Sequence, residues 1–175
     1  MVFFTSDLHF FHDRIIQLVH RPFQSGEEMN RALIDNWNRR VGPQDEVYIL
    51  GDVTMKGTVY ATQALEQLQG IKYLVRGNHD QFVDAAKFET ARFFQWVRDY
   101  ADITVGETRF ILSHYPFLEW NGFYRGTIHL HGHQHNHSGY NFQNQQQGLR
   151  RYDVGVDANY MTPVSAQEIA EFFGP

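Results

Sequence analysis

Short runs of β-branched and aromatic residues recur in the first half of the chain, and each ends in a polar cluster. Residues 2–5 lead into the sequence SDLH at 6–9, residues 47–50 into Gly51-Asp52, and residues 71–75 into GNHD at 77–80. Runs of this length and composition are typical of buried strands. Polar side chains at the carboxyl ends of such strands usually form the site in α/β folds. The pattern therefore predicts an α/β protein with a site built at its strand ends.

Helices are expected between these strands. Asp13 can cap a short helix over residues 13–19, and Ser25 with Glu28 forms a capping box for a longer helix through residue 39. Residues 59–69 are predicted as a further helix that stops at Gly70.

The second half favours strands. Residues 103–112 predict a β-hairpin that ends at His114, and residues 127–131 predict a strand that ends in GHQH at 132–135. Residues 136–148 are rich in Asn, Gln, Gly and Ser without apolar periodicity, so an exposed loop is expected there. A strand over 151–155 and a terminal helix over 164–173 complete the prediction.

Composition bounds the class of protein. The 175 residues are 42% hydrophobic and 20% charged, which is typical of one packed globular domain, predicted over 1–175. The absence of cysteine excludes disulfides, thiolate metal sites and cysteine nucleophiles. A net charge of -5 argues against binding along an extended nucleic acid.

The chain begins directly with an apparent core strand and contains no stretch long and apolar enough to span a bilayer. We therefore expect a cytoplasmic protein without a membrane partner. The sequence leaves the oligomeric state open.

The polar clusters together supply nitrogen and oxygen donors for metal ions. Imidazole, carboxylate and amide groups suit Mn, Zn or Fe and are too rich in nitrogen for Mg or Ca alone. A carboxylate can bridge two cations, and Asp52 is the candidate for that role. The donors that these clusters offer are Asp7, His9, Asp52, Asn78, His79, Asp80, His114, His133 and His135.

The order of these motifs, D-x-H, G-D, G-N-H-D, a lone His and G-H-x-H, resembles the calcineurin-like metallophosphoesterase superfamily from residue 7 to residue 135. The resemblance implies a four-layer α-β-β-α sandwich with a dinuclear metal site at the strand carboxyl ends. It also implies two divalent ions as cofactors, with Mn²⁺ the first choice and Zn²⁺, Fe²⁺/Fe³⁺ or Ni²⁺ as alternatives.

The resemblance assigns roles to the residues. Asp7, His9, Asp52 and His135 would hold the first metal, and Asp52, Asn78, His114 and His133 the second. A metal-bridging hydroxide would attack phosphorus in line. His79 would remain off the metals and stabilise developing charge or protonate the leaving group, so Asp52 and His79 are the predicted catalytic residues.

Each residue alone also has a structural explanation. Asp7 and Asp52 could be turn formers, His114 a buried hydrogen-bonded histidine, and the histidines from 129 to 137 an exposed tract. Their joint occurrence in motif order disfavours these explanations. His129, His131 and His137 share the nominal face of the two candidate ligands in that tract, so His131 stays a candidate for supporting a ligand.

Three further residues are candidates for substrate binding because they adjoin the motifs. His12 and Arg14 follow the first cluster, and Arg76 precedes Gly77. Arg14 could equally be a solvated helix residue, and the strand position of Arg76 could direct it away from the site.

The second motif departs from protein Ser/Thr phosphatases of the superfamily, which continue it as G-D-x-x-D-R-G. This chain has GDVTMKG at 51–57, so protein phosphatase activity is not expected and the residue that orients His79 is not identified. Lys56 could replace the arginine only as a point charge.

About 40 residues follow His135, fewer than a large cap domain needs, so an open groove is expected. The predicted function is a phosphodiesterase acting on a nucleotide or related small diester. The alternatives are a phosphomonoesterase and a non-catalytic metal-binding interaction scaffold.

Overall fold

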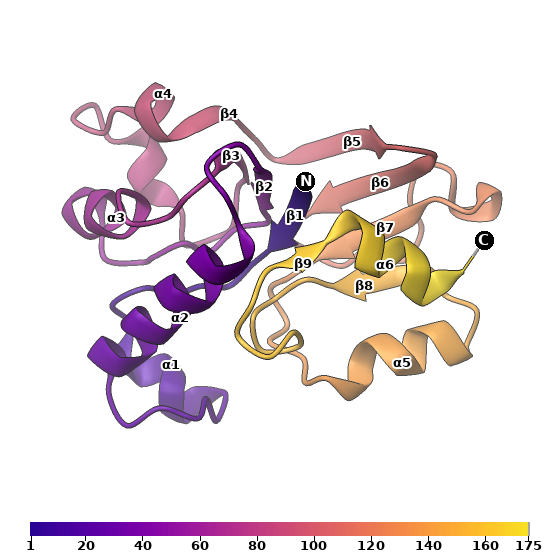
Figure 1. Cartoon of the computed structure of the whole chain (residues 1–175), viewed down its shortest axis with the longest axis horizontal. Helices are drawn as coiled ribbons and strands as arrows, with labels where there is room; N and C mark the ends of the chain where they lie inside the picture. Colours follow the sequence, from indigo (N-terminus) through magenta and orange to yellow (C-terminus); the bar gives the residue numbers. More distant parts are fainter. Residues whose placement is uncertain (175) are drawn as a thin grey trace.

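The computed structural model describes residues 1–174, in which two β-sheets are flanked by helices (Figure 1). The first sheet has the order β4-β3-β2-β1-β9 and the second the order β5-β6-β7-β8. The strands are β1 Val2–Thr5, β2 Glu46–Ile49, β3 Ile71–Val75, β4 Phe94–Arg98, β5 Tyr100–Val105, β6 Thr108–Ser113, β7 Ile128–His131, β8 Arg151–Asp153 and β9 Val164–Ser165.

The helices lie close to their predicted positions in most cases. They are α1 Asp13–Leu18, α2 Gly26–Arg40, α3 Thr58–Leu65, α4 Thr90–Phe93, α5 Gly139–Gln146 and α6 Ala166–Phe173, with 3-10 turns η1 Gln81–Asp84 and η2 Phe123–Arg125. Ser25 caps α2 by accepting from the Glu28 backbone N–H, whereas the Glu28 carboxylate accepts from Gln24. Helix α3 ends at Leu65, four residues before the predicted end.

Alternation along the strands divides the core into two layers. Phe3 and Ile49 of the first sheet pack with Trp37 of α2 in one cluster, because successive side chains of a strand face opposite sides. Phe4 faces the other way and contacts Phe110 of the second sheet, with ring centroids 5.2 Å apart. The two sheets therefore pack face to face around the second cluster.

The outer layers complete the predicted four-layer sandwich, and the predicted fold class is confirmed. Helices α1, α2 and α3 cover the outer face of the first sheet and α5 packs against β8, whereas α6 contacts β9 and β1 (Figure 1). On the outer face of the second sheet, His129 is buried under Phe117 and Trp120, whose rings lie 4.9 and 5.1 Å from it. A loop thus covers the part of this face around His129.

Parallel pairing gathers the carboxyl ends of the strands at one edge. β1, β2 and β3 are parallel, as are β6, β7 and β8. An isolated bridge between Ser6 and Gly155 joins the ends of β1 and β8, so the two sheets share this edge. The polar clusters that follow β1, β2, β3, β6 and β7 are consequently brought together.

The prediction of an exposed loop over residues 136–148 is wrong, because α5 lies within this segment. The helix docks through amides instead of an apolar stripe. Asn141 donates to the Asp153 carbonyl and accepts from its N–H, and Asn144 donates to the Arg151 carbonyl. Apolar periodicity could not reveal a helix whose buried face is polar.

Within residues 1–174, no helix combines the length and apolar character that crossing a bilayer requires.

The carboxylate of Asp80 ties the loops after β2 and β3 together. Its oxygens accept from the backbone N–H groups of Asp52, Val53 and Gly77 at 2.8–2.9 Å, and the side chain is fully buried. Burial raises the pKa of Asp80 to about 6, while these backbone donors act in the opposite direction. The loop that carries Asp52 is thereby fixed relative to the loop that carries Asn78.

We predict that Asp80→Ala lowers the free energy of unfolding by about 3 kcal/mol, because three buried N–H groups lose their acceptor. Urea denaturation measures the change. Asp84→Ala is the matched control, since Asp84 forms an exposed ion pair with Arg76, and pairs of this kind contribute about 0–1 kcal/mol. Equal losses for the two variants would contradict the role given to Asp80.

Candidate metal centre

Two groups of side chains converge at the shared sheet edge, each with donor atoms within 4.8 Å of one another. The first group is Asp7, His9 and His135, and the second is Asp52, His114 and His133. Asn78 adjoins the second group, since its Oδ1 lies 3.0 Å from His114 Nε2. The structure therefore brings together all seven side chains that the sequence offered as metal ligands.

Asp52 lies between the two groups. Its Oδ2 is 3.5 Å from His9 Nε2 in the first group and 3.7 Å from His114 Nε2 in the second. A single carboxylate oxygen thus faces ligand nitrogens of both groups, which is the arrangement that a bridge between two cations needs.

The two buried aspartates of the centre each divide their oxygens between two tasks. Asp7 Oδ2 accepts from the His133 N–H at 2.9 Å and from the Ser6 hydroxyl at 2.7 Å, whereas its Oδ1 has no hydrogen-bond partner. Asp52 Oδ1 accepts from the His79 N–H at 3.0 Å, which leaves Oδ2 toward the histidines. One oxygen of each carboxylate orders the loops and the other remains available.

The donor set fits divalent metal ions. Asp7 Oδ1 and His9 Nε2 are buried without hydrogen-bond partners, a costly state that a bound cation would relieve. Burial raises the pKa of Asp7 to about 6 and lowers the pKa of His9 to about 2. The His9 imidazole is therefore neutral near pH 7 and keeps a lone pair for coordination.

Hydrogen bonds orient two of the ligand histidines. His114 Nδ1 lies 2.7 Å from the Leu50 carbonyl, so Nδ1 carries the proton and Nε2 presents its lone pair to the second group. His135 Nδ1 lies 2.8 Å from Asp157 Oδ2, and its Nε2 lies 3.9 Å from Asp7 Oδ1. Both rings thus direct Nε2 into the centre.

A buried arginine holds Asp157 in place. Arg21 donates to both Asp157 oxygens at 2.9 Å and to the backbone carbonyls of Asp7 and Leu8. Burial alone would raise the pKa of Asp157, but hydrogen bonds from His135 and Arg21 lower it to about 2. Sequence reasoning missed this pair, because 136 positions separate its members and no local pattern connects them.

Left-handed backbone conformations concentrate at the centre. Of the nine non-glycine residues with positive φ in the described chain, five are candidate ligands. These are Asp7, His9, Asp52, His133 and His135, with φ between 50° and 71°. Side chains make this conformation unfavourable, and residues in it cluster at functional sites where the surrounding fold enforces it.

Two motif glycines permit the close approach of the loops. A Cβ on Gly132 would lie 1.9 Å from Ser6 Oγ and 2.3 Å from Asp7 Oδ2, and one on Gly77 would lie 2.3 Å from Asp52 Oδ1. A side chain at either position would displace the carboxylate beside it. The glycines of the motifs therefore act in packing.

His79 lies next to the two groups but belongs to neither. Its ring centroid is 5.6 Å from that of His9, and the ring lines a cavity on the side away from the second sheet. Among residues 1–174, no side chain forms a hydrogen bond with this ring, so the residue that orients His79 stays unidentified.

The other histidines of the tract lie outside the centre. Strand β7 ends at His131, so strand alternation does not extend to His133 and His135. His129 Nε2 accepts from the Phe117 N–H, and His131 contacts the Gly132 carbonyl and the Tyr140 hydroxyl. His131 supports the loop that carries His133 without touching a candidate ligand side chain.

The candidate substrate-binding residues are placed differently from one another. The His12 ring lies 5.5 Å from that of His9, at the margin of the first group. Arg14 is exposed on the first turn of α1. Arg76 donates to Asp84 at 2.8 Å and also faces Asp99, so its guanidinium is already engaged away from the ligands.

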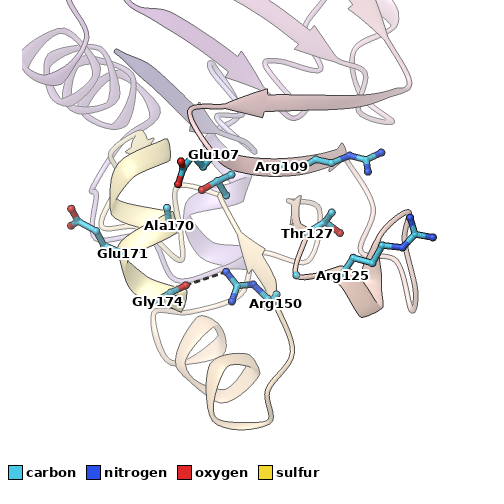
Figure 2. A pocket seen from close by; sticks show the side chains of 10 residues that line it. Glu107, Arg109, Arg125, Thr127, Arg150, Ala170, Glu171 and Gly174 are labelled. Atoms are coloured by element: carbon cyan, nitrogen blue, oxygen red, sulfur yellow. Dashed lines mark hydrogen bonds between the residues drawn. The ribbon is translucent and has the colours of Figure 1, made fainter.

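A second region of the molecule contains a cavity of about 730 Å³, shown in Figure 2. It lies near the amino ends of β6 and β7, at the opposite end of these strands from His114 and His133. Arg150 is turned toward the Gly174 carbonyl, and Arg109 is paired with Asp102. This cavity therefore takes no part in the centre.

Known proteins similar to this chain share nearly its whole length. The uncharacterised protein MJ1445 of Methanocaldococcus jannaschii is 34% identical over 97% of this chain and 89% of its own length. The gene 66 protein of Mycobacterium phage D29 is 32% identical over 90% of this chain and 88% of its own length. The crystal structure of AQ665 from Aquifex aeolicus, a protein of unknown function, superposes with a TM-score of 0.74 at 26% identity, covering 97% of both chains.

The family model of the calcineurin-like phosphoesterases matches residues 1–156, which include every candidate ligand. The resemblance inferred from the motifs is therefore confirmed, and with it the expectation of metal-dependent hydrolysis of a phosphoester. Its fold, its motifs and this match show that the chain belongs to the calcineurin-like phosphoesterase family.

Proposed function

We propose that this protein is a dinuclear-metal phosphodiesterase acting on a nucleotide or related small diester. The observation that carries the proposal is the position of Asp52 Oδ2, which faces His9 of one ligand group and His114 of the other. Asp7, His9, Asp52 and His135 would hold one ion, and Asp52, Asn78, His114 and His133 the other. Two bound ions supply an activated water near neutral pH and neutralise phosphate oxygens.

The chain's own residues would carry the rest of hydrolysis. In the reaction, a water oxygen bonds to phosphorus, the bond from phosphorus to the leaving oxygen breaks, and the leaving oxygen takes a proton. His79 would donate that proton or stabilise the charge, a role that its position beside the ligand groups, without belonging to either, supports. The bond from its backbone N–H to Asp52 Oδ1 holds the His79 backbone beside the carboxylate that faces both ligand groups.

The surroundings of the centre favour a diester over a monoester. A cavity lined by His79 adjoins the first ligand group, and exposed Tyr115 adjoins the second, with its ring 4.6 Å from that of His133. A diester needs room for two substituents. The guanidinium groups of Arg21 and Arg76 are engaged by Asp157 and Asp84, so neither of these two is free to bind the extra charge of a monoester.

Mn²⁺ is the metal we propose, because it binds carboxylate and amide oxygens and also accepts the imidazole nitrogens of this set. Zn²⁺, Fe²⁺/Fe³⁺ and Ni²⁺ fit the same donors and are compared in the assay below.

The assay offers bis-p-nitrophenyl phosphate and p-nitrophenyl phosphate to the protein with each metal in turn. We expect turnover of the diester and at least about tenfold slower turnover of the monoester. The reverse preference would favour a phosphomonoesterase. Stoichiometric binding of two ions without any turnover would favour a non-catalytic scaffold.

Asp52→Ala and His79→Ala should separate the metal ligand from the proton donor. We expect Asp52→Ala to lose both metal and activity, because Asp52 Oδ2 faces both groups. His79→Ala should keep two ions per chain while kcat falls by about 10²–10⁴-fold, the usual contribution of general acid–base catalysis. Plasma mass spectrometry gives the metal content, and unreduced turnover by His79→Ala would contradict its assigned role.

Asp157→Asn should weaken metal binding by about 10–100-fold, because an amide cannot accept from His135 and from both Arg21 donors. Titration calorimetry with Mn²⁺ measures the change. Asp102→Asn is the matched control. Asp102 likewise accepts from the Nε and one Nη of an arginine, Arg109, but this pair lies at the surface. Unchanged affinity in Asp157→Asn would show that His135 does not depend on Asp157.

A further inference from the structure

The lysines of this chain are distributed unusually. The sequence contains only three, Lys56, Lys72 and Lys87, beside twelve arginines. Lys72 is buried and donates to the Leu68 and Gly70 carbonyls, so it has a structural role. The other two are exposed, come from separate loops and line the same cavity as His79.

This cavity has a volume of about 630 Å³ and a cationic lining. None of the eleven residues that line it is Asp or Glu, although the chain carries a net charge of -5. Neither Lys56 nor Lys87 forms an ion pair within the part of the chain that the structure describes. The surface beside His79 therefore concentrates unpaired positive charge in a protein that is acidic overall.

The first turn of α3 contributes to the same wall. Thr58, Val59 and Tyr60 line the cavity, and the helix begins at Gly57 without a side-chain cap. The N–H groups of a first helical turn have no partner within the helix, and they bind anions. Backbone donors and two ammonium groups thus face one space.

The position of His79 relates this space to the reaction. A proton donor must lie next to the leaving oxygen, so the rest of the leaving group extends past His79 on the side away from the ligand groups. His79 lines the cavity and its ring lies 5.6 Å from the His9 ring, whereas none of the seven candidate ligands lines the cavity. The cavity is consequently where the leaving group of a bound diester would reside.

We propose that this cavity binds a second phosphate, carried by the leaving portion of the substrate. The inference rests on the proposed phosphodiesterase function and narrows it. The substrate class is a phosphodiester whose leaving alcohol itself bears a phosphate, as in a phosphorylated dinucleotide or a nucleic-acid end. Lys56 and Lys87 recognise the phosphate as point charges, and Gln81 adds a polar donor at the rim.

The test compares the thymidine dinucleotide TpT with pTpT and TpTp, each of which has one additional terminal phosphate, on the Mn²⁺-loaded protein. The products show which nucleoside leaves, and therefore which of pTpT and TpTp carries its extra phosphate on the leaving nucleoside. We expect that dinucleotide to have about tenfold higher kcat/KM than TpT. In Lys56→Ala/Lys87→Ala the ratio should fall to about 1–2, since the recognising charges are gone.

The ratio of kcat/KM for the phosphorylated dinucleotide to kcat/KM for TpT is measured within one variant, so a general loss of activity does not change it. Circular dichroism checks that each variant is folded. Arg39→Ala/Arg125→Ala, which removes the same charge from exposed positions away from the cavity, should retain the full ratio. If the dinucleotides are not cleaved, the ratio is taken from their inhibition constants against bis-p-nitrophenyl phosphate. If the protein also cleaves a ten-residue thymidine strand and this cleavage depends on the two lysines, the cavity binds an internal phosphate. If the preference is restricted to the dinucleotide, the cavity binds a terminal phosphate.

Equal kcat/KM for all three dinucleotides, or a ratio unchanged in the lysine variant, would overturn this inference while leaving the diesterase in place. Absence of turnover with bis-p-nitrophenyl phosphate and every dinucleotide would instead overturn the proposed function itself. The two failures are therefore distinguishable.

Discussion

Buried carboxylates that divide their oxygens between backbone and site hold this structure's functional edge together. Asp7 and Asp52 each use one oxygen to accept an N–H from another loop and leave the other free toward imidazole nitrogens. Asp80 uses both oxygens on backbone donors. Buried charge is costly unless it is satisfied, so the loops and the cations that complete the centre depend on the same few carboxylates.

The packed sheets supply the rigidity that this arrangement needs. Five candidate ligands have left-handed φ angles, which an isolated loop would not maintain. Pairing of Ser6 with Gly155 and of His114 with the Leu50 carbonyl joins the edges of the two sheets directly beneath these residues. Side chains on the outer face of the second sheet, such as His129, serve packing and leave the chemistry to the loops.

The positively charged side chains around the metal centre have two different roles. Arg21 donates to Asp157, and Asp157 in turn bonds to His135. The charge of Arg21 therefore stabilises the position of a candidate metal ligand and does not bind substrate. Lys56 and Lys87 remain unpaired beside His79 within the described chain. The protein is acidic overall and has only three lysines, so these two give the leaving-group side of the centre a local positive charge.

The sequence by itself determined most of the strands, though not β4 and β9, and the order of the motifs and hence the family, because apolar runs that end in polar clusters reflect local chain properties. Parallel strands place their carboxyl ends at one edge, so the polar clusters were expected to converge, and the resemblance to the family indicated which seven side chains would be ligands. It missed α5, whose buried face is formed by asparagines, and it could not separate His131 from His133 by alternation. Only the tertiary structure decided which oxygen of Asp52 faces both groups, that Asp157 orients His135, and that two distant lysines share a cavity with His79. These are contacts between residues far apart in the chain, and no local pattern encodes them.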